Sequence, residues 1–392
     1  MSNLDKTTDL NPRFLWCFLK IFSCEGGIQS YVKDILDAYI NLLEPLATSK
    51  TSTQFSSEVL LLHDPPGSPN PYENSSLEFH YLQTKPPVLG GVRLVSALLN
   101  HLILQRPQRV FCGHINLAPL IQLLCQPFGV PYTVLTYGKE VWQPLSPRYR
   151  NALEKADQIW TISRYSRDQA CEANQLDAQK FRLIPCMVDG NHFTPGPKPQ
   201  HLIERYGLQD TKVLMTVARL WSGDIYKGVD VTIRALPQIS QKIPNVKYLV
   251  IGRGDDQPRL ANLAKELGVA DQVVFAGFVP TEELVDHYRV ADAYIMPSQE
   301  GFGIVYLEAM ACGIPVLSGN ADGSADPLQD GKLGWQVPHR DPDAVAKACI
   351  EILQGDDQRC QGEWLRQQSL AQFGQEAFRV QLRELLNFPV VS

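Results

Sequence analysis

Hydrophobic residues alternate between two spacings along the whole chain. Short continuous apolar runs, such as Phe14–Ile21 and Val213–Ala218, are typical of buried β-strands. Between such runs, apolar residues recur three or four positions apart, which indicates amphipathic helices. The pattern predicts strands over 14–21, 58–62, 77–82, 109–113, 132–137, 158–163, 181–188, 213–218, 247–251, 273–276, 293–296 and 315–318. It predicts helices over 28–39, 92–104, 118–125, 148–155, 166–172, 228–239, 258–267, 282–288 and 304–311.

The repeated strand–helix units place the chain in the α/β class. Continuous Val, Ile and Leu strands of this kind form parallel sheets with helices on both faces. The segment Thr194–Pro199 carries three prolines and cannot continue a helix or a central strand. The pattern restarts after it, so the sequence predicts two Rossmann-like domains, 1–193 and 201–370, joined by a linker at 194–200. A parallel sheet binds its ligand beyond the carboxyl ends of its strands.

Composition narrows the class of function. The 392 residues are 44% hydrophobic and carry a formal net charge of −6, which argues against broad nucleic-acid binding. The nine cysteines stand singly, without zinc or disulfide spacing, as expected of reduced thiols in a cytoplasmic protein. The polar segment Met1–Pro12 does not read as a signal peptide. The longest apolar stretches, 14–22 and 94–104, are shorter than a membrane span, but peripheral contact with the cytoplasmic face of a membrane stays open.

The densest chemical signal follows the strand that ends at Met296. A loop with Glu300, Gly301 and Gly303 runs directly into a helix. Glycines let the backbone approach a ligand, and a helix N-terminus offers unpaired amides with partial positive charge, so this loop predicts a phosphate cradle. Glu300 stands at its mouth and Glu308 on the helix; ionised carboxylates accept hydrogen bonds from sugar and ribose hydroxyls.

Two cations lie on the loop after the strand that ends at Ala218. Arg219 and Lys227 are suited to neutralise a diphosphate and to stabilise it as it leaves. Gly252 and Gly254 follow the next strand, where a Gly-x-Gly turn is by itself a weak signal.

The text around Glu300 and Glu308 resembles the motif of two glutamates, separated by seven residues, of retaining GT-B glycosyltransferases (glycosyltransferase family 4). In that family the first glutamate faces the donor sugar and the second holds the nucleotide ribose. The resemblance extends the donor site to Gly301, Phe302, Gly303 and Ile304. It implies contacts of Arg219 and Lys227 with the donor pyrophosphate, and of Gly252 and Gly254 with the nucleotide. Phe278 and Val279 occupy the place of the family's base pocket, although simple packing explains them equally well.

The same resemblance implies roles for the first domain. Gly26 and Gly27 are similar to the glycine loop that approaches the donor phosphates and the acceptor, with Glu25 an unusual neighbour. His114, at the end of a strand, is similar to the family's histidine near the reacting sugar. Tyr137 and Glu140 replace the histidine and aspartate of a family segment, which leaves their roles open. Residues 1–193 would then bind the acceptor, residues 201–370 the nucleotide sugar, and a helix in 371–392 would pack back on the first domain.

The implied reaction is retaining transfer of a hexose from a nucleotide-sugar donor to an acceptor hydroxyl. A UDP-sugar, with glucose as the first candidate, is favoured only because such donors are common in the family, and the acceptor is a glycan, a lipid or a small molecule. His114, Glu300, Arg219 and Lys227 are the expected catalytic residues. No Asp-x-Asp element occurs in the site loops, so neither a metal nor a cofactor is expected. Two alternatives remain: a nucleotide-sugar epimerase or phosphorylase of the same architecture, and an inactive nucleotide-binding module.

Overall fold

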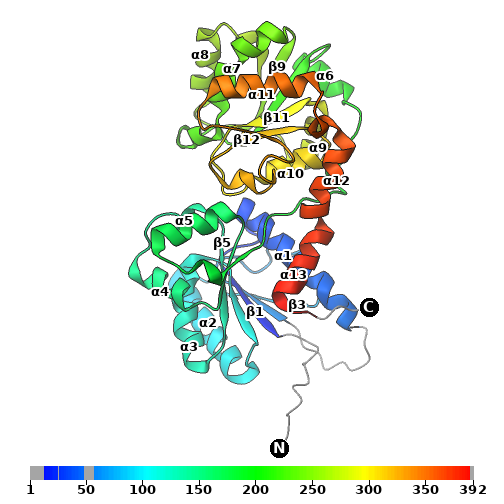
Figure 1. Cartoon of the computed structure of the whole chain (residues 1–392). Helices are drawn as coiled ribbons and strands as arrows, with labels where there is room; N and C mark the ends of the chain where they lie inside the picture. The colour runs from blue at the N-terminus through cyan, green and yellow to red at the C-terminus, as the bar shows by residue number, and fades with distance from the viewer. Residues whose placement is uncertain (1–12, 25, 48–56, 389–392) are drawn as a thin grey trace, which may run out of the picture. The chain divides into compact units, whose positions relative to one another are not determined.

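The computed structural model describes residues 13–24, 26–47 and 57–388. The segment Met1–Pro12 and Glu25 lie outside the described residues. The chain forms two compact units, one of residues 1–185 with 378–392 and the other of residues 186–377 (Figure 1).

The segment expected as the linker, 194–200, is part of the second unit. Arg289 donates a hydrogen bond to the Thr194 carbonyl (3.0 Å), and Lys198 forms an ion pair with Asp292 (2.8 Å). The division falls earlier, between Pro185 and Cys186. The expectation was wrong because prolines exclude regular structure without marking where the tertiary contacts of a chain change.

The first unit is built on a seven-stranded parallel sheet with the order β3-β2-β1-β4-β5-β6-β7. Its strands are β1 (Phe14–Phe18), β2 (Ser57–Leu61), β3 (Leu77–Tyr81), β4 (Arg109–Cys112), β5 (Tyr132–Thr136), β6 (Gln158–Thr161) and β7 (Phe181–Leu183). Its helices are α1 (Gly27–Ala47), α2 (Pro87–Asn100) with the π-helical turn His101–Gln105, α3 (Ala118–Phe128), α4 (Pro147–Lys155), α5 (Arg164–Asn174) and most of α13 (Gln375–Leu386).

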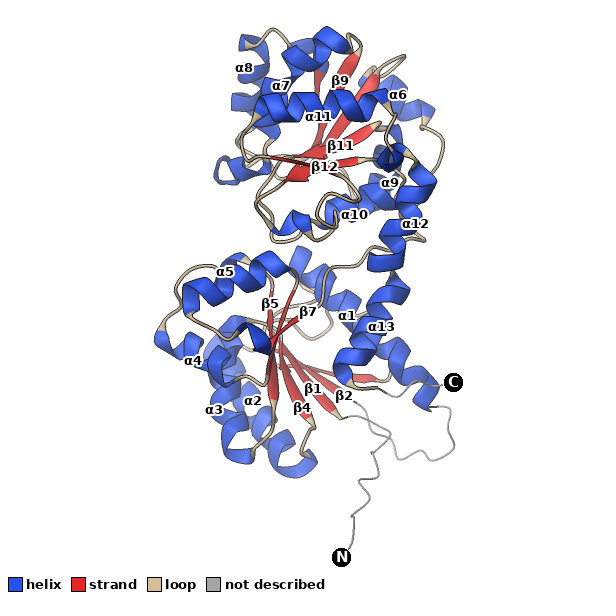
Figure 2. Ribbon diagram, viewed as in Figure 1, coloured by secondary structure: helices blue, strands red, loops and turns tan. Residues whose placement is uncertain are grey.

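Helices cover both faces of this sheet (Figure 2). Apolar side chains of α2, α3, α4 and α5 pack on one face in a single core cluster. On the other face, Trp16 of β1 stacks on Phe111 of β4 (centroids 3.9 Å apart), and Tyr39 of α1 contacts Trp16. Phe388, just after α13, contacts Phe14 and Tyr39, so the C-terminal segment completes the core of the first unit.

The second unit has a six-stranded parallel sheet with the order β10-β9-β8-β11-β12-β13. Its strands are β8 (Lys212–Val217), β9 (Val246–Ile251), β10 (Val273–Gly277), β11 (Ala293–Met296), β12 (Val316–Gly319) and β13 (Trp335–Val337). Its helices are α6 (Gln200–Tyr206), α7 (Val229–Lys242), α8 (Gln257–Glu266), α9 (Thr281–Val290), α10 (Ile304–Ala311), α11 (Pro342–Gln354) and α12 (Gly362–Phe373). The helices α7, α8 and α11 cover one face, whereas α9 and α10 contact Tyr294 on the other.

The predicted α/β fold class with two Rossmann-like domains is therefore confirmed. Some elements differ from the prediction: β13, α6, α11 and α12 were not predicted, and β7 ends at Leu183 instead of 188. The sequence does indicate where α11 begins and ends. The Asp341 side chain accepts from the Ala344 amide at its start, and Gly355 (φ +81°) ends the helix.

One helix of the first unit is longer and more apolar than expected. The helix spans 19 residues over Pro87–Gln105 and contains an 18-residue window with a mean hydropathy of 1.5, which is long and apolar enough for a membrane span. Core helices of globular domains meet the same criterion. Leu94, Leu98 and Leu102 pack into the core cluster of the first unit, whereas Val88 and Leu104 are 76% and 73% exposed.

Candidate functional site

The candidate donor residues of the second unit lie on loops at the carboxyl edge of its sheet. Strand β8 stands between β9 and β11, so the chain order reverses at this point of the sheet. Such a switch point opens a crevice between the loops that leave neighbouring strands. The loops after β8, β9 and β11 carry Arg219 and Lys227, Gly252 and Gly254, and Glu300–Gly303.

Hydrogen bonds join two of these loops and the loop after β12 into one cluster. Lys227 forms a short ion pair with Glu300, and both side chains are more than four-fifths buried. The Gln299 amide donates to the Tyr226 carbonyl (3.1 Å), next to Lys227. The loop after β12 supplies Asp322, whose Oδ2 accepts from the Glu300 amide (2.5 Å). A charged lysine and a glutamate are thus held in fixed positions at the switch point.

Asp322 is a part of this site that the sequence analysis missed. Its carboxylate is buried, and it accepts from the Ser324 amide (2.9 Å) at the start of the short helix Gly323–Ala325. Burial raises the pKa of Asp322, although hydrogen bonds from Ser324 and the Glu300 amide act in the opposite direction. The available signal was the sequence Asp-Gly-Ser in the loop after a buried strand, which is typical of a capping turn.

At two of the predicted glycine positions on the sheet edge, the structure leaves no room for a Cβ atom. Gly252 has φ +135°, and a Cβ there would stand 1.8 Å from the Ala218 carbonyl oxygen. Gly303 has φ +91°, and a Cβ would stand 2.4 Å from the Tyr306 ring. Only glycine adopts such backbone geometry without strain. The backbone of both loops therefore runs closer to its neighbours than any side chain would permit.

Helix α10 begins at Ile304, directly after the Glu300 loop. Among the described residues, no side chain caps its N-terminus, and its first turn contains no acidic residue. The Tyr306 amide donates to the Gly303 carbonyl (3.1 Å), and the binding of a phosphate by the amides before it stays a prediction. Phe302, by contrast, is buried and contacts Phe373, so its side chain supports the loop instead of facing a ligand.

Glu308 is half-buried on α10 and accepts a hydrogen bond from the Tyr288 hydroxyl (2.6 Å). Burial raises the pKa of the Glu308 carboxyl, although the Tyr288 hydrogen bond acts in the opposite direction. The sequence did not foresee Tyr288, which comes from α9 and orients this acceptor.

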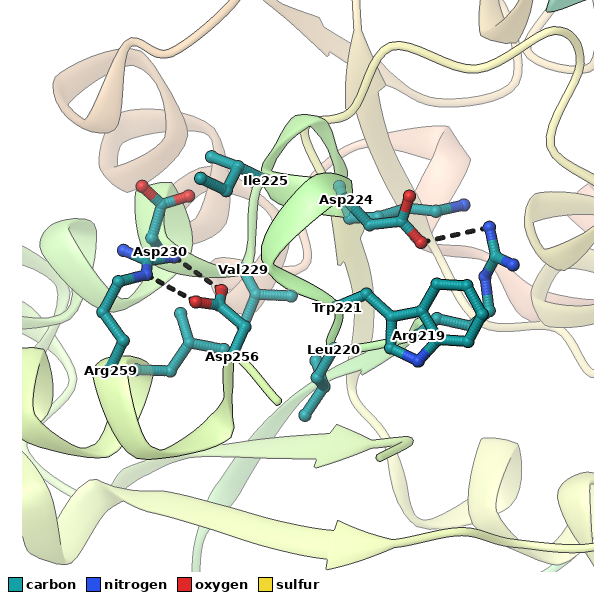
Figure 3. A pocket seen from close by; sticks show the side chains of 11 residues that line it. Arg219, Leu220, Trp221, Asp224, Ile225, Val229, Asp230, Asp256 and Arg259 are labelled. Carbon is teal, nitrogen blue, oxygen red and sulfur yellow. Dashed lines mark hydrogen bonds and ion pairs between the residues drawn. The ribbon is translucent and has the colours of Figure 1, made fainter. Parts of the chain in front are cut away.

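Arg219 is the most exposed of the predicted cations. Its side chain is 59% exposed, lies 3.1 Å from the Asp224 carboxylate and packs over the Trp221 ring. Figure 3 shows this pair on one side of the loop after β8 and the Arg259–Asp256 pair on the other. The Arg259 pair is bidentate, with both distances 2.6 Å. Arg219 therefore keeps an exposed guanidinium at the sheet edge, while Arg259 is committed to a structural partner.

Phe278 and Val279, the expected base-pocket residues, differ in their surroundings. Val279 is buried, whereas Phe278 is 60% exposed and its ring is covered by the Arg253 guanidinium, 4.8 Å from the centroid. An exposed aromatic ring offers a surface on which a base can stack.

The first unit places its candidates at the carboxyl edge of its own sheet. Gly26 and Gly27 lie where α1 begins, and a Cβ on Gly27 would meet no heavy atom of the described chain within 4 Å. His114 follows β4, and its Nδ1 accepts from the Asn116 amide (3.1 Å). Burial lowers the pKa of His114, although Glu140 acts in the opposite direction, so the neutral imidazole is favoured near pH 7.

The structure explains the two departures from the family segment. The Tyr137 hydroxyl donates to the Gly113 carbonyl (2.6 Å), directly before His114, and Glu140 accepts from the Tyr137 amide. Tyr137 and Glu140 are thus positioned to hold the backbone that carries His114.

Comparison with known proteins shows what this arrangement is similar to. Residues 201–363 match the family described as glycosyl transferases group 1.

Among curated relatives, the GDP-mannose-dependent alpha-(1-6)-phosphatidylinositol monomannoside mannosyltransferase of Mycolicibacterium smegmatis is 38% identical over 231 residues. That alignment covers 56% of this chain and 59% of the relative, so the match spans about three fifths of the relative's length. The corresponding monoacylated-substrate mannosyltransferase of Corynebacterium glutamicum is 26% identical over 342 residues, 84% of this chain and 85% of the relative.

A solved structure of Anabaena HepE in complex with UDP superposes with a TM-score of 0.72 at 19% identity, covering 96% of this chain and 99% of that one. At this identity the likeness concerns the fold, and it confirms the predicted GT-B class.

Proposed function

We propose that this protein is a glycosyltransferase that moves a hexose from a nucleoside-diphosphate sugar to an acceptor hydroxyl. The observation that carries the proposal is the cluster of Lys227, Glu300 and Asp322 beside the uncapped N-terminus of α10. A cation and unpaired amides at one sheet edge suit a departing diphosphate, whose negative charge grows in the transition state. Arg219, exposed on the same loop as Lys227, supplies a second cation for the diphosphate.

In the proposed reaction Glu300 orients the donor sugar and Glu308 accepts from the ribose hydroxyls. The sugar is transferred with retention at its anomeric carbon. We assign to His114 of the first unit the role of a neutral hydrogen-bonding group toward the reacting sugar. Catalysis then rests on positioning and on stabilisation of the leaving diphosphate, without a catalytic metal ion.

For the donor, the names of the mycobacterial relatives favour GDP-mannose over the UDP-sugar expected from sequence. Purified protein incubated with GDP-mannose, UDP-glucose or ADP-glucose distinguishes these donors in a thermal-shift assay. A ligand at one hundred times its Kd stabilises the folded state by about 2.7 kcal/mol. A shift with one nucleotide family, lost in Arg219→Ala and Glu308→Ala, supports the donor site. Absence of a shift with all three would count against the proposed donor site.

For the acceptor, we propose a glycolipid or lipid headgroup at a membrane surface. The mannosyltransferase relatives are named for phosphatidylinositol monomannoside substrates. In this chain, Val88, Val92 and Leu104 of the helix Pro87–Gln105 are exposed, and Arg93 and Arg106 are exposed beside them. An apolar helix face with adjacent cations suits peripheral contact with anionic lipid at the cytoplasmic face.

Sedimentation with vesicles tests the membrane contact. The protein should bind vesicles that contain anionic lipid more tightly than zwitterionic ones, and Val88→Glu with Leu104→Glu should abolish binding. Leu123→Glu, at another exposed position of the first unit, is the control. Equal binding of the double variant would refute this surface, whereas transfer to a soluble acceptor would remain testable separately.

The reaction itself is tested by product analysis. Release of free nucleoside diphosphate only with an acceptor supports a transferase, and the anomeric configuration of the product by NMR tests retention. Interconversion of sugar nucleotides without acceptor would instead identify an epimerase.

A further inference from the structure

Three side chains that are distant in sequence meet on one face of the first unit's sheet. Glu58 of β2, His80 of β3 and His101, at the start of the π-helical turn after α2, present ligand atoms within 4.8 Å of one another. The His80 Nε2 lies 2.6 Å from Glu58 Oε2, and the His101 Nε2 lies 2.5 Å from the same oxygen. None of the three belongs to the proposed donor or acceptor residues.

The register of the sheet and the packing of α2 bring these three side chains close together. In the parallel pairing of β2 with β3, Leu60 stands opposite His80 and Glu58 opposite Glu78. Side chains two positions apart on a strand share a face, so Glu58 and His80 lie on the face that carries Leu60. Leu60 packs in the same core cluster as Leu94 and Leu98 of α2. The helix therefore brings His101 onto the two strands.

The other ring nitrogen of His101 determines what its Nε2 can do. Nδ1 lies 2.6 Å from the Ala97 carbonyl oxygen, which can only accept, so Nδ1 carries a proton. A neutral His101 then points the lone pair of Nε2 at the Glu58 carboxylate, an arrangement that requires a proton or a cation between the two atoms. Such a carbonyl contact is the usual outer-shell partner of a metal-binding histidine.

Because His101 and Glu58 are buried, the need for a proton or a cation between them is strict. The side chains of His101 and Glu58 are only 7% and 11% exposed, whereas that of His80 is 32% exposed. Both Nε2 atoms thus meet one carboxylate oxygen in a largely dry site, where buried charges are costly unless they are paired or coordinate a metal.

We propose that Glu58, His80 and His101 form a Zn²⁺ site, with water or Glu78 in the fourth position. Two imidazole nitrogens and one carboxylate oxygen are a ligand set that zinc favours, and zinc is commonly tetrahedral with such ligands. Glu78 Oε1 lies 3.7 Å from the His80 Nε2, on the exposed side of the cluster. Small side-chain movements that separate the two nitrogens from the glutamate oxygen make room for the ion.

The bound ion would fasten α2 to the edge of the sheet. Strand β3 is the outermost strand, paired only with β2 in the described sheet, and α2 carries the exposed apolar face described above. Zinc would link β2, β3 and the end of α2 through three side chains. It acts as a structural ion, so sugar transfer does not require it to touch substrate.

The test is metal binding to the full chain after removal of metal with a chelator and exchange into metal-free buffer. Calorimetric titration with Zn²⁺ should show one site per chain, and Co²⁺ should give the visible absorption of a tetrahedral site. His80→Ala and Glu58→Gln should weaken binding by at least about tenfold. The exposed residue His201 provides the control, since His201→Ala should bind as the unchanged chain does.

Circular dichroism of each variant shows whether it is folded, and His80→Ala is the decisive one because His80 is the most exposed of the three ligands. Saturating Zn²⁺ should raise the Tm of the unchanged chain by roughly 5 °C and leave that of folded His80→Ala unchanged. Absence of saturable Zn²⁺ binding, or equal binding in His80→Ala and Glu58→Gln, would overturn the proposal. Either result leaves the transferase proposal standing, because transfer is measured separately with chelated protein.

Discussion

Each sheet has loops at its carboxyl edge, and the contacts among these loops differ between the two units. In the second unit, the loops after β8, β11 and β12 contact one another through Lys227–Glu300 and Glu300–Asp322. In the first unit, the loops are joined in separate pairs: Asp64 after β2 accepts from the Ile21 amide after β1, and Tyr137 after β5 donates to the Gly113 carbonyl before His114. Substitutions in a cluster whose loops share partners should have non-additive effects, whereas substitutions in different pairs of loops should have additive effects.

The largest effect is expected at Lys227. We expect Lys227→Ala to lower kcat by about 10² to 10³-fold, because it removes a cation from the departing diphosphate and leaves Glu300 without its partner. Steady-state kinetics with donor and acceptor measure the loss. The exposed Lys242, at the end of α7, provides the matched control Lys242→Ala. A fall of less than threefold would contradict the assignment of Lys227.

Asp322→Asn should produce the next effect, a fall in kcat of about tenfold. The two carboxylate oxygens accept separately from the Glu300 and Ser324 amides, and an asparagine places an NH₂ group against one of these donors. Asp343→Asn, on the exposed first turn of α11, is the control.

A double-mutant cycle with Lys227→Ala tests whether the cluster acts as one body. Loss of kcat in the double variant should be clearly smaller than the product of the two single losses. Fully multiplicative losses would show that the two loops act independently, and the contrast between the units would disappear.

Much of this site could be predicted because its signal is continuous in the sequence. Glu300, Gly301, Gly303 and Glu308 stand within one loop and the helix that follows it, where each residue supports the interpretation of the next. Strands were predicted well because buried parallel strands are continuous apolar runs.

The remaining features depend on tertiary contacts, which spacing does not reveal. Tyr288 reaches Glu308 from another helix, and Asp322 reaches Glu300 from another strand. Glu58 and His101 are 43 positions apart and meet only through strand register and helix packing. The division of the chain at 185 was missed for the same reason: contacts, not composition, decide where a unit ends.

A smaller, pH-dependent effect is expected at Glu308. Its raised pKa means that the carboxyl gains a proton at a higher pH than an ordinary glutamate does, and the protonated form is a poorer acceptor for ribose hydroxyls. The KM for the donor should therefore rise as the pH falls towards this pKa. Glu308→Gln should raise KM by a few fold, roughly 1 kcal/mol, and remove this pH dependence.

Tyr288→Phe tests whether Glu308 is the group whose protonation changes the KM for the donor. The Tyr288 hydroxyl favours the ionised carboxylate, so its loss should move the same KM transition to higher pH. An unchanged pH profile in both variants would show that another group titrates.

The smallest effect is expected at Tyr137 in the first unit. Tyr137→Phe leaves the Gly113 carbonyl without its donor and should lower the free energy of unfolding by about 1 kcal/mol, measured by denaturant titration. Tyr149→Phe, whose hydroxyl only accepts an exposed hydrogen bond from Arg148, is the control. If the loops of the first unit are coupled only in pairs, kcat of Tyr137→Phe should change by less than about threefold. A loss of kcat as large as that of Asp322→Asn would mean that Tyr137, Gly113 and His114 also act as one body, and both edges would then be cooperative sites built from different contacts.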